Sequence, residues 1–293
     1  MNGVIVVDKP EGWTSHDAVN KIRRLVGIRR VGHLGTLDPM ATGVLPLVVG
    51  SATRLAQFYT RSDKVYDAVI RFGYSTDTYD REGAPTSPIT EPVITREQLE
   101  PLLDRFRGQI RQTPPPISAK KVGGVPAYRL ARKNVAVELK PVDVTIHSLE
   151  LIECSGAEAR IVVHCSAGTY LRAMAHDLGA LLGCGAFLKN LKRTRSGEFS
   201  IEKARTIEQL EELAREERMI EAFIPAADLL PEFPSEFVDP TTAAFIRQGR
   251  DFRVSPFRVR PGARFVKAIG DNGQLIAIGE ARLPNLYHPM LVL

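Results

Sequence analysis

The order of hydrophobic and polar residues divides the chain into short strands and helices. Apolar runs over residues 3–7 and 44–50 are typical of buried strands. Over residues 64–73 the side chains alternate, which places Tyr66 on the more apolar of the two faces. From this pattern alone, a packed core tyrosine is the simplest interpretation of Tyr66.

Capping residues mark the expected helix starts. Thr95 and Thr206 are each followed three positions later by a glutamine, which is the pattern of a capping box. These boxes predict helices that reach about residues 108 and 218. Ser15 is expected to cap a helix that ends at Gly27. Further helices are expected over residues 52–59, after a Ser51 cap, and over residues 173–182.

The second half of the chain is rich in expected strands. Residues 142–154 and 159–165 alternate well enough to form an antiparallel pair. The sequence Asp271-Asn272-Gly273 predicts a hairpin turn between strands at 265–269 and 275–278. The acidic helix after Thr206 and the proline-punctuated stretch 225–234 are interpreted as a connector.

Composition is that of an ordinary globular protein. The 293 residues are 44% hydrophobic and 25% charged, enough for one large domain or a domain with a small appendage. The N-terminus lacks the pattern of a secretory leader, and no apolar run approaches membrane-spanning length. A cytoplasmic location is therefore expected. Three cysteines without C-x-x-C spacing indicate neither a disulfide framework nor a zinc site.

Charge is segregated along the chain. The net charge is +5, with a pI of about 9.1. Residues 111–140 hold seven Lys and Arg against one Glu, and residues 240–293 hold eight against three acids. Residues 207–236 instead hold nine acids against two Arg. Basic segments of this kind suit contact with a phosphate backbone, although a solvated basic face would have the same composition.

The stretch from His33 to Gly43, here called the signature segment, carries the candidate chemistry. Its glycines tolerate positive φ and Pro39 fixes its own φ, so a tight, fixed loop is expected. Asp38 precedes the proline and is conformationally restricted. Asp38 either caps a short turn or is an aimed reactive carboxylate.

The signature segment resembles a motif of the TruB family, the tRNA pseudouridine-55 synthases. The matching residues are Gly32-His33-x-Gly35-Thr36-Leu37-Asp38-Pro39-x-Ala41-Thr42-Gly43. Three more segments are similar to the family: residues 8–15, residues 64–83 with K-x-Y and T-D-T-x-D, and residues 165–172 with C-S-x-G-T-Y-x-R. Residues 187–197 resemble the next family motif, and the similarity is looser over residues 240–293.

The resemblance implies roles for individual residues. Asp38 would be the catalytic carboxylate, acting as nucleophile or base, and Arg172 would pair with it. Tyr66 would stack on the target base and take part in proton removal, whereas Tyr170 and Leu191 would line the base pocket. His33 would insert into the tRNA T loop. The simpler alternatives are core packing for Tyr66, Tyr170 and Leu191, and a local hydrogen bond for His33.

Residues 111–141 form a basic, loop-rich insertion that either is an exposed surface loop or closes over the T arm of tRNA, as the resemblance implies. The candidate contacts to the RNA backbone are Lys64, Lys120, Lys121, Arg129 and Arg132.

The resemblance further implies an α+β pseudouridine synthase fold, with a central mixed, mainly antiparallel sheet flanked by helices. A catalytic domain is expected at residues 1–225 and a small, β-barrel-like RNA-binding domain of the PUA type at 236–293. Isomerisation of uridine needs a flipped base and a carboxylate but no redox change, so neither cofactor nor metal is expected.

The function implied is formation of pseudouridine at position 55 of tRNA by a stand-alone monomer, without a membrane or an obligatory protein partner. Two alternatives remain open from the sequence. A non-catalytic tRNA-binding or tRNA-folding protein would need the basic segments only. A subunit of a guide-RNA-dependent pseudouridylase would share the catalytic motifs.

Overall fold

The computed structural model describes residues 2–117, 121–122, 125–126, 139–260 and 262–293, with backbone only at 121, 122, 125 and 126. Of the candidate RNA contacts, Lys120, Arg129 and Arg132 lie outside the described residues, as does the side chain of Lys121. Within the described part of the insertion, β6 (Lys121–Val122) pairs antiparallel with β7 (Val125–Pro126).

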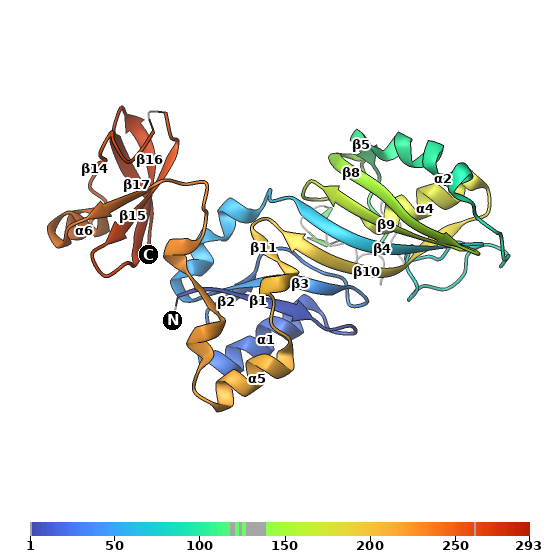
Figure 1. Cartoon of the computed structure of the whole chain (residues 1–293), viewed down its shortest axis with the longest axis horizontal. Coiled ribbons are helices and arrows are strands. Elements are labelled where there is room, and N and C mark those ends of the chain that lie inside the picture. The colour runs from blue at the N-terminus through green and yellow to red at the C-terminus, as the bar shows by residue number, and fades with distance from the viewer. Residues whose placement is uncertain (1, 118–120, 123–124, 127–138, 261) are drawn as a thin grey trace.

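A ten-stranded sheet, here called the main sheet, forms the body of the molecule (Figure 1). Its strand order is β12-β1-β3-β10-β4-β9-β8-β5, with β2 on β3 and β11 on β10. All pairings between its named strands are antiparallel except that of β10 with β3. The strands are β1 (Gly3–Lys9), β2 (Val31–His33), β3 (Thr42–Val49), β4 (Lys64–Phe72), β5 (Gly108–Gln112), β8 (Val142–Ser155), β9 (Glu158–Cys165), β10 (Ala186–Ser196), β11 (Phe199–Ser200) and β12 (Phe223–Pro225).

Helices cover the main sheet in two groups (Figure 1). α1 (Ser15–Val26) lies beside α5 (Ile207–Arg215), and Lys21 forms an ion pair with Glu211 between them. α2 (Arg96–Leu103) and α4 (Leu171–Leu182) cover the other half. The 3₁₀ turns are Gly50–Tyr59, Asp104–Phe106, Ile201–Lys203, Met219–Ala222 and Ala226–Asp228.

Local patterns predicted most of these elements. The burial of β4 alternates strictly, with Tyr66 on the buried face, and both predicted capping boxes are present. Two predicted caps are wrong. Thr14, not Ser15, caps α1, because Thr14 forms a capping box with Asp17. Ser51 caps nothing, because residues 50–59 form a 3₁₀ turn that starts at Gly50 without a side-chain cap.

A second sheet, here called the C-terminal sheet, has the order β13-β15-β16-β17-β14. The predicted hairpin is its centre, with β15 paired to β16. The stretch predicted to be a connector also contributes to the main sheet, because Phe223–Pro225 forms strand β12 and pairs with β1. The elements are β13 (Ser235–Val238), α6 (Pro240–Arg247), β14 (Phe252–Arg253), β15 (Phe265–Gly270), β16 (Leu275–Leu283) and β17 (Leu286–Val292).

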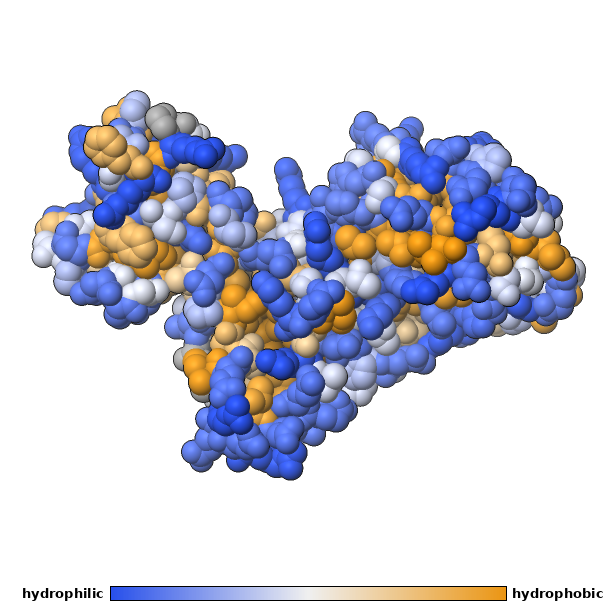
Figure 2. Space-filling model, in the orientation of Figure 1, coloured by the Kyte–Doolittle hydropathy of each residue, from blue (hydrophilic) through white to orange (hydrophobic). Residues whose placement is uncertain are grey.

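One apolar cluster joins the two sheets. It contains Leu55 from the main body and Ile278 and Leu291 from the C-terminal sheet, all buried. The rings of Phe58, Phe233 and Phe265 pack with centroids 5.1 to 5.5 Å apart. Figure 2 shows a largely hydrophilic face, with hydrophobic side chains gathered in separate patches over both sheets. Among the described residues, no helix has the length and apolar character needed to cross a membrane.

Candidate active site

The signature segment connects β2 to β3 and is fixed in place by glycine geometry. Gly35 and Gly43 have φ of 124° and 99°, as the sequence predicts. At Gly43 a Cβ would lie 2.2 Å from the carbonyl oxygen of Arg193, because β3 runs directly against β10 there. Only glycine therefore permits this close approach.

Buried polar side chains hold the signature segment from both sides. The Lys9 ammonium, fully buried, donates to the carbonyl oxygens of Pro10, Trp13 and Pro39 at 2.7 to 3.2 Å. Ser15 exchanges two hydrogen bonds with the backbone of Leu37, at 2.8 and 3.1 Å. Each side chain therefore fixes the backbone immediately next to Asp38.

Arg193 supplies the third support. It is 1% exposed, and its guanidinium donates to the carbonyl oxygens of Gly35, Thr36 and Val44. A buried charge is costly unless its donors are satisfied, and these carbonyls satisfy them. The positive charge of the same guanidinium also lies close enough to Tyr66 to affect the pKa of its phenol.

Arg172 connects two carboxylates. Its Nε lies 2.9 Å from Oδ2 of Asp38, and its Nη1 lies 3.4 Å from Oδ2 of Asp80. Nη1 also donates to the carbonyl oxygen of Thr78 at 3.1 Å. The side chains of Arg172 and Asp80 are 7% and 5% exposed, whereas that of Asp38 is 36% exposed. Asp80 and Thr78 thus hold the arginine, and the arginine orients the more accessible carboxylate of Asp38.

A cavity of about 280 Å³ opens beside Asp38. Tyr66, Tyr170 and Leu191 line it together with Asp38 and Lys64, so the structure brings these predicted residues to one place. Tyr66 and Leu191 are 9% and 8% exposed and give the cavity apolar walls. The cavity can hold a flat, partly apolar group against a carboxylate.

Two residues that line the cavity, Lys64 and Tyr170, are held in place by hydrogen bonds to neighbouring residues. Lys64 is buried and donates to the carbonyl oxygen of Ser62, so it can reach RNA only inside the cavity. Burial lowers the pKa of its ammonium, and the nearby Arg193 lowers it further. The backbone of Tyr170 is held by Gln112, which bonds both its N–H and its carbonyl oxygen at 2.8 and 3.0 Å.

Tyr66 keeps its proton in this environment. Burial raises the pKa of the phenol, and Arg193 partly opposes that rise. A neutral phenol next to Asp38 can stack on a base and exchange a hydrogen bond, but it carries no charge at neutral pH.

His33 lies on the other side of Asp38. It lines a second cavity of about 610 Å³, whose wall Asp38 and Arg172 share with the first. Burial lowers the pKa of the His33 imidazole, and Arg193 lowers it further. Among the described residues, its Nδ1 has no hydrogen-bond partner. The sequence left open a local hydrogen bond for His33. Within the described part of the chain, Nδ1 does not form such a bond.

Sequence reasoning missed Arg193 and Asp80. Arg193 lies in a segment rich in cations, from Lys189 to Arg195, which is typical of a solvent-exposed strand. It is buried because the side chains of β10 alternate between the two faces of the sheet. Asp80 lies within the resembled T-D-T-x-D motif, which could have identified it as a partner of Arg172.

Two family models match the chain. A model described as the N-terminal domain of TruB family pseudouridylate synthases matches residues 23–171. A model described as the C-terminal domain of tRNA pseudouridylate synthase B matches residues 172–231. The tRNA pseudouridine synthase B of Solibacter usitatus (strain Ellin6076) is 60% identical over 293 residues, the whole of both chains. That of Azoarcus sp. (strain BH72) is 45% identical over 86% of this chain and 84% of its own length.

Solved structures share the fold. A chain in the structure of an H/ACA RNP bound to a substrate RNA containing 2′-deoxyuridine has a TM-score of 0.72 and 23% identity, over 99% of this chain and 84% of its own. One in the archaeal box H/ACA sRNP Nop10-Cbf5 complex has a TM-score of 0.70 and 24% identity, over 99% and 85%. The expected fold class, a mixed and mainly antiparallel sheet with helices and a curled C-terminal sheet of the PUA type, is confirmed.

Proposed function

The chain belongs to the TruB family of pseudouridylate synthases, and from this premise we propose that it converts the uridine at position 55 of the tRNA T loop into pseudouridine. It is a tRNA pseudouridine synthase, an isomerase that breaks the bond between ribose C1′ and uracil N1 and rejoins the ring through C5. Relatives named tRNA pseudouridine synthase B match 86% to 100% of this chain, which supports the tRNA substrate.

One observation carries the assignment of the site: the Asp38 carboxylate, paired with Arg172, faces a cavity whose other walls are Tyr66, Tyr170 and Leu191. A glycosidic bond can be attacked only if its uridine leaves the stack and enters a pocket next to a carboxylate. The cavity offers that carboxylate, an aromatic ring for stacking and an apolar wall.

Each side chain then has a definite task. Asp38 acts at the sugar of the flipped nucleotide, as nucleophile or as base, while Arg172 fixes its orientation. Tyr66 stacks on the uracil and is placed to receive or return a proton through its hydroxyl. Tyr170 and Leu191 close the slot, and His33 occupies the space on the T-loop side of Asp38.

RNA binding is assigned to the basic segments. The insertion at residues 111–141, with Lys120, Lys121, Arg129 and Arg132, closes over the T arm, and Lys64 contacts the target nucleotide inside the cavity. Residues 236–293 supply a second RNA contact as a PUA-like domain next to the catalytic domain at 1–225. Wide backbone contacts offset the cost of flipping the base, which is a few kcal/mol. The enzyme works in the cytoplasm as a stand-alone monomer.

The test is release of tritium from C5-labelled uridine in a T-arm transcript by the purified protein alone. Asp38→Asn should abolish release while leaving tRNA binding largely intact, and Asp104→Asn, at an exposed aspartate that also pairs with an arginine, Arg107, is the matched control. Substantial turnover by Asp38→Asn would remove Asp38 from its role. No turnover by the wild-type protein alone would favour a guide-dependent enzyme or a non-catalytic RNA binder.

A further inference from the structure

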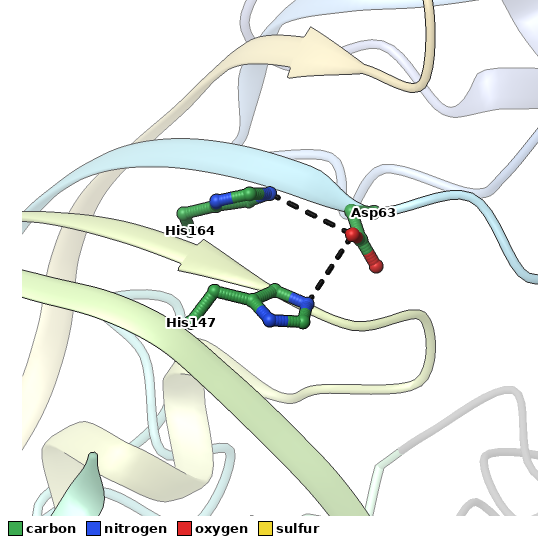
Figure 3. Close-up of side chains that lie close together, drawn as sticks. All are labelled: Asp63, His147 and His164. Carbon is green, nitrogen blue, oxygen red and sulfur yellow. Dashed lines mark ion pairs between the residues drawn. The ribbon is translucent and has the colours of Figure 1, made fainter. Parts of the chain in front are cut away.

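Two histidines and an aspartate converge on the outer side of the main sheet. Asp63 precedes β4, His147 lies in β8 and His164 in β9, so the group joins three neighbouring strands. Figure 3 shows both imidazole rings directed toward the Asp63 carboxylate. His147 Nε2 lies 3.2 Å from Oδ2 of Asp63, and His164 Nε2 lies 3.7 Å from the same oxygen.

The strand register explains why these side chains meet. Val65 pairs with His164 and Lys64 with Cys165, so successive residues of β9 point to opposite faces. Lys64 faces the cavity, and His164 faces away from it. His147 sits at a bulge, where Ile146 pairs with Cys165 but Ser148 already pairs with His164. A bulge re-aims the extra side chain, and here it turns His147 toward His164.

The geometry is that of a metal site. One ligand atom from each residue lies within 4.8 Å of the other two. Zinc binds imidazole nitrogen and carboxylate oxygen at about 2.0–2.2 Å in a tetrahedron, which separates ligand atoms by roughly 3.3–3.5 Å. The two nitrogen-to-oxygen distances, 3.2 and 3.7 Å, bracket that separation closely.

The state of His164 also suits a ligand. Its Nε2 is buried and, within the described part of the chain, has no hydrogen-bond partner at normal distance. An imidazole nitrogen whose lone pair accepts no hydrogen bond is free to bind a divalent cation.

We propose that Asp63, His147 and His164 bind one divalent transition-metal ion of the zinc class. Two imidazoles and one carboxylate suit zinc better than magnesium or calcium, which prefer oxygen ligands. Three protein ligands leave a fourth position for water or an RNA phosphate oxygen. The ion connects the start of β4 to β8 and β9. The site lies on the face of the sheet opposite the cavity, next to Lys64 in the sequence.

Sequence spacing cannot reveal this site, because its ligands come from three segments far apart in the chain. The absence of C-x-x-C spacing bears only on cysteine-based zinc sites. The guanidinium of Arg195 is near enough to lower the pKa of His164, and its positive charge opposes a bound cation. The affinity for the metal ion therefore depends on attraction by the three ligands and on repulsion by the nearby Arg195.

The experiment uses full-length protein without a histidine tag, freed of metal with a chelator and dialysed against zinc chloride. We expect one equivalent of zinc by mass spectrometry, with a Kd measured by competition against a chromophoric chelator. His147→Ala and His164→Ala should each weaken binding about tenfold or more, since even supporting residues of metal sites contribute 10–100-fold. Asp63→Asn, which keeps the size of the side chain, should weaken zinc binding. Arg195→Met, which removes a nearby positive charge, should strengthen zinc binding.

His288→Ala is the matched control, because His288 also pairs with an aspartate, Asp251 at 2.7 Å, on the C-terminal sheet. It should bind zinc as the wild type does. Cobalt substitution gives a second readout, since its visible spectrum reports a tetrahedral site and should vanish in His147→Ala. Lack of stoichiometric zinc in the wild type would overturn the proposal, as would equal binding by Asp63→Asn, or equal loss in His288→Ala.

Discussion

The signature segment and the C-terminal sheet are both held against the main sheet, but by different kinds of contact. The signature segment is held by directional hydrogen bonds from Lys9, Ser15 and Arg193, which are almost completely buried. The C-terminal sheet is held mostly by an apolar cluster that contains Leu291 and by packed aromatic rings. Directional bonds fix the position of an atom, whereas apolar area stabilises an interface without fixing any one atom.

This difference matches what each region has to do. In the proposed reaction, Asp38 must stand at a fixed place relative to a bound sugar, and a displacement of about 1 Å can cost 10²-fold in rate. The C-terminal sheet, proposed as a second RNA contact, must stay attached to the main sheet but places no reacting group. Lys267 shows that the rule is not absolute, because its ammonium donates to the carbonyl oxygens of Ala227 and Leu229 at 2.9 Å at the junction.

The largest expected effect comes from removing Arg172. Arg172→Met leaves Asp80 buried without its cation and releases Asp38, so the single-turnover rate should fall at least about 10²-fold. Loss of one partner of a buried pair should also lower the free energy of unfolding by about 3–5 kcal/mol. Single-turnover tritium release and urea unfolding measure the two. Arg218→Met, at an exposed arginine that pairs with Glu216 and Glu221 in the acidic segment, should change neither by much.

Lys9→Met tests the support of the signature segment directly. The carbonyl oxygens of Pro10, Trp13 and Pro39 lose their shared donor, which should lower the free energy of unfolding by roughly 1–3 kcal/mol. The rate should fall more than tenfold under conditions where the variant is fully folded, because Pro39 follows Asp38. A folded variant with the wild-type rate would contradict the idea that these bonds place the carboxylate.

Leu291→Ala tests the apolar cluster, where we expect a loss of stability without a loss of rate. Leu291 is 3% exposed, and its truncation should lower the free energy of unfolding by about 2–5 kcal/mol. The single-turnover rate at saturating protein should stay within about twofold of the wild type, since no contact of the signature segment changes. A rate loss comparable to that of Lys9→Met would erase the distinction between the two regions.

Ser15→Ala should have an effect no larger than that of Lys9→Met. It leaves the N–H and carbonyl oxygen of Leu37 without a partner and should lower the free energy of unfolding by about 1–3 kcal/mol. Thr14, which caps α1, is untouched, so helix content by circular dichroism should not change. If helix content falls with stability, Ser15 supports α1 rather than the signature segment.

The last expected effect is a pH dependence of stability. Burial lowers the pKa of Lys9 to about 8, whereas an unfolded lysine titrates near 10.4. Between these values the unfolded chain holds the extra proton, so the stability contributed at Lys9 rises with pH from about 8 to 10.4. The stability difference between wild type and Lys9→Met, from urea unfolding, should therefore widen over that window. A constant or shrinking difference would mean that Lys9 keeps its proton in the folded protein over this window.

The sequence by itself determined most of what depends on neighbouring residues. The alternation around Tyr66, the capping boxes at Thr95 and Thr206, and the hairpin before Leu275 follow from local periodicity and turn chemistry. Motif resemblance also identified Asp38 and Arg172 as a pair before any distance was measured.

Only the tertiary structure decided which distant polar groups meet. Ser15 looks like a helix cap but bonds Leu37, and Arg193 looks like a surface cation but is buried against Gly35. The three candidate metal ligands, including His147, meet through strand order and one bulge. Such contacts depend on sheet order and register, which are set by the packing of the whole chain and leave no local pattern in the sequence.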